Sequence, residues 1–447
     1  MENILLDVSK TVVNEAVREG YDEAIVITRY NYNTMAKIFN SQLSVVQKWV
    51  DYSIELYLAK DKRVIILSLY PSDIESTAKL TLKEMISRAK SIQESPFYAP
   101  IPEPKRVEPL TNIYDSRVLD AIEDPSKLVE LAIEASHRER IDYVAGMINL
   151  WIRSKTLVSS KGAELYEEAS GMQTYLRAFS EPDGSGQWSY CSVKLEPRGI
   201  EETALIAADY AIKSRGRTGL EPGRYDVILS PMVAGNLIEL VASMSSAFSM
   251  LMGMSIFMKN SPGDIVASDK LTVLDKPRDV DLPEATAFDD ESTPTFDKPI
   301  IEKGVLKTIL HNSKTASLTG METTGNAGWV NPHPWNIVVE PGDYTLDEMI
   351  REVKRGILVT NNWYTRLQNY VEGIFSTISR DALLYIENGE IKKPVEKVRI
   401  ADKLPNLLRN IDGLTKNIYN IMWWEVSIPS KIPYILVRNV NITKHLL

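Results

Sequence analysis

The chain has 447 residues, of which 44% are hydrophobic and 25% charged, and this length predicts two or three globular domains. A formal net charge of −9 argues against a nucleic-acid-binding protein, because such proteins usually carry a basic face that neutralises phosphates. The single cysteine, Cys191, excludes a disulfide framework, and no apolar leader with a basic start is visible, so we expect a cytoplasmic protein.

Residues 1–218 predict an N-terminal α+β domain in which one pattern of elements occurs twice. The halves are residues 1–95 and 120–218, and a proline-rich connector over 96–110 joins them. Each half begins with a helix, continues with alternating segments typical of antiparallel strands, and ends with a second helix. We therefore expect two related helix-plus-sheet units that pack together.

In the first half, apolar spacing predicts a helix that ends near Gly20, and a second helix over 72–92. The second half has helices over 124–138 and 199–214 and a hairpin loop at 181–186. Short strands are expected between the helices at 23–30, 34–40, 44–50, 52–59, 64–70, 142–154, 156–162, 163–169, 171–179 and 187–193.

A long apolar segment follows the strand at 225–230 and has no charged residue from Leu240 to Met258. Its length is about that of a membrane span. Several serines and Gly253 dilute it, and no second apolar run or flanking basic cluster accompanies it. We interpret the segment as a helix buried in the protein core and expect no membrane association.

Residues 219–447 predict a C-terminal β-rich domain, a mixed or mostly antiparallel sheet or open barrel around that buried helix. Asn388-Gly389 favours a type I′ hairpin turn between two strands. Helices are expected over 345–355 and 404–412. The expected β segments lie at 270–275, 299–312, 336–343, 355–361, 382–400 and 434–442.

The motifs of P-loop, dinucleotide-binding, thiol-redox and α/β-hydrolase proteins are absent, and the four histidines are too widely spaced to chelate a metal from one helix. The stretch FDDEST contains Asp289, Asp290 and Glu291. Such a cluster could provide a general base or an ion site, but we interpret it as a solvated acidic loop before Pro294.

Nearly all of residues 224–397 is covered by an ordered set of stretches: VILSPMVAGNLIE, FDDESTPT, GVLKTIL, TASLTGMETTGNA, NIVVEPGD, GILVT and LLYIENGEIKKPV. In content and order this set resembles the TldD/PmbA family, whose members have been called modulators of DNA gyrase and are now regarded as peptidases.

In the family's catalytic branch, the helix after the Ser-Pro turn carries HExxxH, in which two histidines bind zinc and the glutamate activates water. Alignment through Gly235 puts Glu239 at the first histidine, Leu240 at the glutamate and Met244 at the second histidine. The cysteine that the family places near its C-terminal end is missing as well. The resemblance therefore implies the non-catalytic TldE branch, with no catalytic residue and no metal on this chain.

For that branch the resemblance implies a heterodimer with a zinc-bearing TldD-like homologue, or a homodimer, acting on unfolded or modified peptides in extended form. It also implies a peptide cleft between the halves. Thr324, Gly325 and Asn326 match the family's STGNA-like loop, and His333 follows in a proline-rich turn. The same loop is equally well explained as a tight turn that requires positive φ at Gly325.

Two further hypotheses stay open. The chain could be a self-sufficient peptidase whose site is built from Glu239, His311 and the region of Asp290. It could also be a binding protein without proteolytic function, for which its acidic charge suits a protein partner better than DNA.

Overall fold

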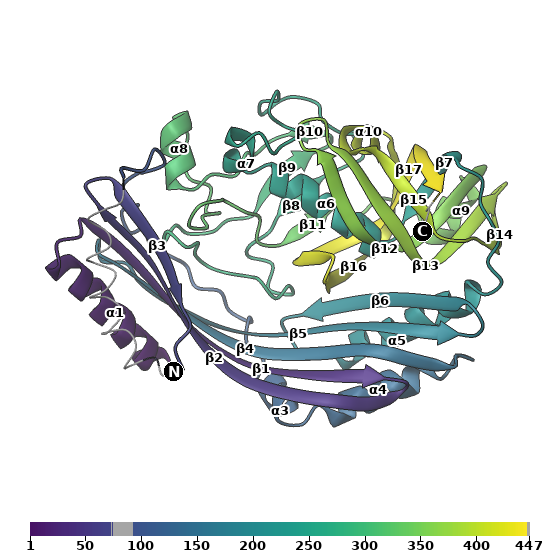
Figure 1. The fold of residues 1–447 in the computed structure, drawn as a ribbon, viewed down its shortest axis with the longest axis horizontal. Coiled ribbons are helices and arrows are strands. Elements are labelled where there is room, and N and C mark those ends of the chain that lie inside the picture. The colour runs from purple at the N-terminus through teal and green to yellow at the C-terminus, as the bar shows by residue number, and fades with distance from the viewer. Residues whose placement is uncertain (73, 75–92, 445–447) are drawn as a thin grey trace.

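The computed structural model describes residues 1–72, 74 and 93–444. Their strands form a six-stranded antiparallel sheet in the N-terminal part and an 11-stranded mixed sheet in the C-terminal part. Figure 1 shows the first sheet as a long curved layer and the second sheet facing its concave side. This arrangement confirms the predicted α+β class.

The first sheet has the strand order β3-β2-β1-β4-β5-β6, so the inner strands of two three-stranded units pair with each other. Helices α1, α3 and α4 lie on the side of this sheet that faces away from the second sheet (Figure 1). Its elements are α1 (Glu2–Arg18), β1 (Glu23–Phe39), β2 (Gln42–Lys60), β3 (Arg63–Leu69), α3 (Ser116–Glu123), α4 (Ser126–Ser136), β4 (Tyr143–Ser159), β5 (Glu164–Ser180), β6 (Gly184–Ser192) and α5 (Pro197–Lys213).

The two units join where β1 and β4 pair in antiparallel orientation, with Thr28 opposite Thr156. The hydroxyls of these threonines bond to each other, and the Ser9 hydroxyl of α1 lies 3.0 Å from both. Because all three groups are buried, this contact satisfies polar atoms that would otherwise destabilise the centre of the sheet.

The prediction of many short strands is wrong, because the structure has fewer and longer ones. Segments 23–30 and 34–40 are one strand, β1, and the segments from 163 to 179 are one strand, β5. The polar residues Asn31 and Asn33, which lie between those two predicted segments, alternate along one face of β1, and the Asn31 amide donates to Asp51 on β2 (2.7 Å). The helix predicted over 72–92 lies outside the described residues, apart from its first residues.

In the second sheet, the long strand β17 (Val426–Lys444) pairs with four neighbours. The expected hairpin is confirmed, since Asn388 and Gly389 both have positive φ (52° and 77°). The remaining elements are β7 (Gly223–Leu229), α6 (Pro231–Met244), α7 (Ala247–Leu251), β8 (Val273–Asp275), β9 (Lys298–Glu302), β10 (Val305–Leu306), α8 (Ser313–Thr319), β11 (Ile337–Val339), α9 (Leu346–Arg351), β12 (Arg355–Asn369), β13 (Ile374–Glu387), β14 (Glu390–Pro394), β15 (Val398–Lys403), α10 (Leu404–Arg409) and β16 (Ile411–Trp423).

The apolar segment after β7 is not one helix. Helix α6 ends at Met244, and the Ser246 side chain accepts a hydrogen bond from Ser249 and begins the short helix α7. A serine hydroxyl that bonds to nearby backbone competes with helix continuation, which explains the break. Within the part of the chain that the structure describes, no helix has the length and apolar character that a membrane crossing requires.

The predicted division into two domains at residue 218 stays a prediction. Helix α5, which precedes that position, packs Ala207 and Ala211 into one hydrophobic cluster with Met232 and Leu436 of the following part. The two sheets therefore share buried apolar surface in addition to polar contacts.

Candidate functional site

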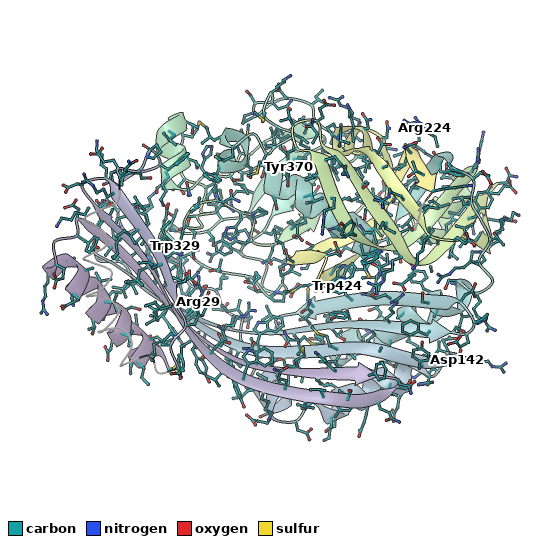
Figure 2. The ribbon with its side chains drawn as sticks, viewed as in Figure 1. Arg29, Asp142, Arg224, Trp329, Tyr370 and Trp424 are labelled. Atoms are coloured by element: carbon teal, nitrogen blue, oxygen red, sulfur yellow. The ribbon has the colours of Figure 1, made fainter. Side chains whose placement is uncertain are left out.

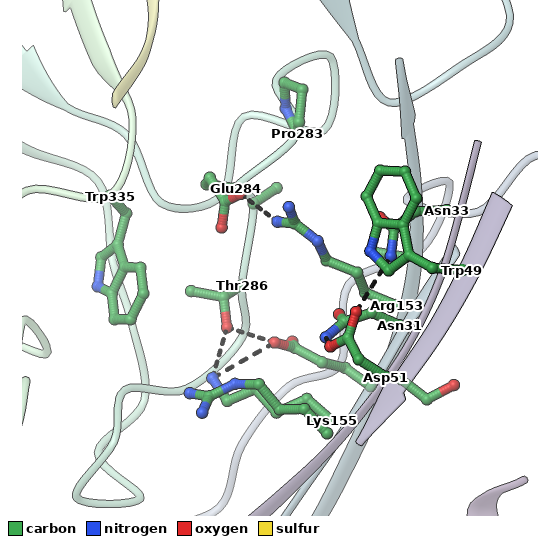
Figure 3. A pocket seen from close by; sticks show the side chains of 15 residues that line it. Asn31, Asn33, Trp49, Asp51, Arg153, Lys155, Pro283, Glu284, Thr286 and Trp335 are labelled. Carbon is green, nitrogen blue, oxygen red and sulfur yellow. Dashed lines mark hydrogen bonds and ion pairs between the residues drawn. The ribbon is translucent and has the colours of Figure 1, made fainter. Parts of the chain in front are cut away.

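A polar pocket of about 380 Å³ lies between the concave face of the first sheet and the loop over residues 283–286. Strands β1, β2, β4 and β5 form one wall of the pocket, and Trp335 lies across from them (Figure 3). Period-two alternation brings these side chains together, because alternate residues of neighbouring paired strands face the same side of a sheet.

The cations of the pocket are held by acidic groups from both parts of the chain. Arg29 forms an ion pair with Glu55 of β2, and its Nη2 lies 3.4 Å from Oδ1 of Asp290 in the C-terminal part. Lys155 donates to the Phe288 carbonyl oxygen (3.2 Å) and lies 4.0 Å from the same Asp290 oxygen. These contacts fix the loop of the C-terminal part against the sheet.

On the other side of the pocket, Asp51 accepts from the amides of Asn31 (2.7 Å) and Asn33 (3.5 Å), while Arg153 pairs with Glu284. The Trp49 ring lies over this group (Figure 3). The amides and carboxylates on these neighbouring strands can hydrogen-bond to the polar groups of a bound chain. The exposed aromatic ring can cover an apolar side chain of that chain.

The predicted solvated acidic loop is wrong, because Asp289, Asp290 and Glu291 are all buried. Glu291 pairs with Lys314 (2.6 Å) and accepts from the Ser313 backbone N–H (2.7 Å) at the start of α8. Asp290 faces the first sheet. Each carboxylate has a cationic or N–H partner, and such partners offset the desolvation that makes buried charge unfavourable.

The Asp289 carboxylate stabilises this loop by accepting hydrogen bonds from backbone N–H groups of other residues. Its Oδ1 accepts from the N–H groups of Glu291 (3.0 Å) and Thr293 (2.8 Å), and its Oδ2 accepts from that of Ala327 (3.0 Å). Burial, and to a smaller extent the nearby Glu291 charge, raises the pKa of Asp289 to about 7. The three N–H groups act in the opposite direction and lower the pKa, but their effect is smaller. The carboxyl is therefore poised to titrate near neutral pH.

The residues predicted to line a peptide cleft do not line this pocket. Thr324 exchanges hydrogen bonds with the His311 backbone, and the buried Asn326 bonds to Asp275 and to the His333 carbonyl. Gly325 has a φ of +68°, and a side chain there would meet the Pro294 carbonyl oxygen. The positive φ at Gly325 agrees with the explanation of this loop as a tight turn. Thr324 lines a second cavity of about 740 Å³, and the assignment of the loop to a peptide cleft stays a prediction.

The positions that align with the zinc motif do not offer a zinc site. Both carboxylate oxygens of Glu239 accept hydrogen bonds from the start of β17, from the Ser427 hydroxyl and the Ile428 N–H (3.1 Å). Burial raises the pKa of this carboxyl. Leu240 packs against the hydrophobic core and Met244 belongs to it. A lone carboxylate with two hydrocarbon-packed neighbours does not fit Zn²⁺, which prefers histidine, cysteine and carboxylate ligands in a tetrahedral set.

The three groups proposed for a self-sufficient site have separate partners. Glu239 bonds to β17, His311 lies 3.2 Å from the Thr315 hydroxyl, and Asp290 faces Arg29. Burial lowers the pKa of His311. Among the described residues, no group of three or more His, Cys, Asp or Glu side chains is arranged to hold a metal ion.

Sequence reasoning missed the pocket residues of the first sheet, such as Arg29, Asp51 and Lys155. The alternation of polar residues in RYNYNT was the available signal, because period two in a strand marks one face. It becomes visible only when the strands are recognised as long and continuous.

Residues 222–444 match the model of the PmbA/TldA metallopeptidase C-terminal domain. A protein named metalloprotease from Methanothermobacter thermautotrophicus is 26% identical over 64% of this chain and 65% of its own length. Metalloprotease PmbA from Escherichia coli is 29% identical over 47% of this chain and 46% of its own length. The matches thus span less than two thirds of these relatives.

Two solved structures share the fold over nearly the whole chain. TldE from Thermococcus kodakarensis superposes with a TM-score of 0.86 at 19% identity, covering 98% of this chain and 100% of that one. A protein from Thermotoga maritima, described as a candidate modulator of a DNA gyrase, superposes with a TM-score of 0.84 at 23% identity, covering 98% and 99%.

Proposed function

Because this chain belongs to the PmbA/TldD family through its C-terminal domain, residues 222–444, we propose that it is the metal-free subunit of a TldD/TldE-type metallopeptidase complex. In this proposal a homologous chain carries the zinc, and the pair cleaves unfolded or modified peptides. This chain contributes no catalytic residue and binds part of the extended peptide.

The observation that carries the proposal is the packing of α6. A catalytic member would need metal-ligating side chains at the positions of Glu239 and Met244 and a general base at Leu240. Here the Glu239 carboxylate is hydrogen-bonded to β17, Met244 lies in the hydrophobic core, and Leu240 packs against that core. Helix α6 therefore packs against the second sheet as part of the core and has no free metal ligands at these positions. This packing supports assigning the metal to another chain.

The polar pocket supports the peptide-binding part of the proposal. An extended peptide presents N–H and C=O groups at regular intervals, and the amides and carboxylates of Asn31, Asn33 and Asp51 provide partners for both. The mouth of the pocket also exposes the Trp49 ring, which suits an apolar side chain of the peptide.

Co-expression with a zinc-bearing homologue tests the subunit role. We expect hydrolysis of an unfolded peptide by the pair, none by this chain alone, and stoichiometric zinc only in the pair. Hydrolysis by this chain alone, with one zinc bound to it, would contradict the proposal.

Asp51→Asn tests the pocket in the active pair. Removing the charge should raise KM for the peptide and leave kcat nearly unchanged, because the interaction is made with the bound chain before and during the reaction. Asp61→Asn, at the exposed turn between β2 and β3, is the matched control and should change neither constant. Equal kinetics for the two variants would remove the pocket from the proposal.

A further inference from the structure

The polar pocket between the two sheets contains more acidic than basic charge. Its cationic side chains are Arg29, Arg153 and Lys155, and each of them forms an ion pair with at least one carboxylate. The carboxylates that line the pocket or pair with those cations are Asp51, Glu55, Glu167, Glu284 and Asp290. Three positive and five negative charges sum to −2, so the pocket favours a cationic group over an anionic one.

Asp51 is the carboxylate of this group that has no cation beside it. Glu167 and Glu284 each pair with a cation of β4, whereas Asp51 forms no ion pair within the part of the chain that the structure describes. Its Oδ1 accepts from the Asn31 amide (2.7 Å) and its Oδ2 from the Asn33 amide (3.5 Å). A carboxylate has about four acceptor sites, so both oxygens retain room for a further donor. The two amides therefore hold the carboxylate in place and leave its charge unpaired.

Trp49 lies beside this carboxylate on the same face of β2. Residues two apart in a strand point to one side and lie about 7 Å from each other, and both side chains point into the pocket (Figure 3). The Trp49 side chain is 36% exposed. A long basic side chain suits this pair, because its methylene stem can lie on an aromatic ring while its charged end reaches a carboxylate.

We propose that Trp49 and Asp51 bind a lysine or arginine side chain of the extended peptide. This inference rests on the proposed function and names the kind of side chain that the peptide places in the pocket. The ammonium or guanidinium group donates to the free acceptor sites of Asp51 and forms a charge-assisted hydrogen bond. The methylene stem is then the apolar group that contacts the Trp49 ring.

Other kinds of side chain are disfavoured at this place. An acidic side chain would bring a like charge against Asp51. A neutral apolar side chain would cover the carboxylate without pairing it, and the loss of water around an unpaired charge is unfavourable. The unpaired carboxylate thus selects for positive charge, and the peptides that bind best should contain a basic residue.

Calorimetric titration of the full chain with two peptides tests this selectivity. Both peptides have nine residues of alanine and serine with capped ends, and they differ at the central position. One carries arginine there, and the other carries citrulline, a neutral side chain of nearly the same shape. We expect the arginine peptide to bind roughly tenfold more tightly at low salt, and the ratio to fall at high salt because salt screens exposed charges.

Two variants of Asp51 connect this ratio to the carboxylate. Asp51→Asn should reduce the preference for arginine to within about twofold, because the amide carries no charge. Asp51→Glu keeps the charge and should retain a preference. Asp61→Asn, at the exposed turn after β2, is the matched control and should retain the full ratio. A merely structural role of Asp51 would weaken both peptides equally and leave their ratio unchanged.

The outcomes separate this inference from the proposed function. Equal binding of both peptides by the wild-type chain, or an undiminished preference in Asp51→Asn, would overturn the basic-side-chain site and leave peptide binding intact. Binding of neither peptide would contradict both the site and the peptide-binding role of this chain.

Discussion

Trp423 is the last residue of β16 and Trp424 follows it in the turn to β17; their ring centroids lie 6.0 Å apart, yet the two residues differ sharply in exposure. The Trp423 ring is 1% exposed and belongs to a hydrophobic cluster beneath the second sheet, whereas the Trp424 ring is 63% exposed. Figure 2 shows Trp424 on the side of the second sheet that faces the first sheet. The Arg380 guanidinium lies 5.4 Å from its ring centroid.

Replacement of each tryptophan by alanine should therefore have different effects on stability. We expect Trp423→Ala to lower the free energy of unfolding by about 3–5 kcal/mol, because it leaves a cavity in the core. Trp424→Ala should change it by no more than about 0.5 kcal/mol, as surface substitutions do. Urea denaturation of the two variants measures both values, and equal losses would contradict this assignment.

Met244 should behave as a core residue and not as an unused ligand position. Met244→Ala is expected to lower the free energy of unfolding by about 2–5 kcal/mol. Met252→Ala provides the control, because that side chain is 51% exposed just after α7. If Met244→Ala unfolds like the wild type, the explanation for the missing zinc site given above fails.

The Asp289 carboxyl should make stability depend on pH. Its folded pKa of about 7 lies above the ordinary value of 3.8, so between these values the folded state binds more protons than the unfolded state. The stabilising contribution of this group to the free energy of unfolding is largest below pH 4. It decreases as the pH rises to about 7 and does not change above that pH.

Chemical denaturation over a pH series checks this direction. Asp289→Asn should remove that part of the slope, although it also replaces an acceptor for the Ala327 N–H by a donor and lowers stability at every pH. Asp61→Asn, at an exposed carboxylate, should retain the slope. A slope that persists unchanged in Asp289→Asn would assign the pH dependence to other groups.

Gly325 and Gly320 have the same backbone conformation but differ in the space available for a side chain. Both have positive φ (68° and 69°), but a Cβ at Gly325 would lie 2.7 Å from the Pro294 carbonyl oxygen, while nothing lies within 4 Å at Gly320. Gly325→Ala should therefore be the more destabilising change, by roughly 1–3 kcal/mol beyond the strain common to both. Thermal unfolding measures the difference, and similar transitions for both variants would count against a steric role for the loop.

The sequence predicted those features that depend on local chemistry. Asn388-Gly389 forms its hairpin because few other residue pairs adopt positive φ twice, and α6 begins where Ser230 caps a proline-led turn. Its predictions were wrong where tertiary contacts decide. Asn31 and Asn33 interrupt no strand, because their partner Asp51 comes from β2, a contact that local pattern does not contain.

The acidic loop illustrates the same limit for the candidate site. A run of three carboxylates is usually solvated, and local composition favoured that interpretation. Burial becomes possible through residues distant in the sequence, namely Arg29 before the loop and Lys314 after it. The pocket could not be predicted for the same reason, because its walls come from strands that lie side by side only in the folded protein.

The pairing of β1 with β4 also has a consequence for synthesis on the ribosome. Strand β1 emerges early, but the partner for its inner edge, Tyr143–Ser159, is translated only after the first unit and the connector are complete. Until then β1 and its apolar residues present an unpaired edge, and closing so long a loop is slow. The nascent chain thus depends on rapid emergence of its second unit, and a pause in translation between the two units would favour misassembly and chaperone binding.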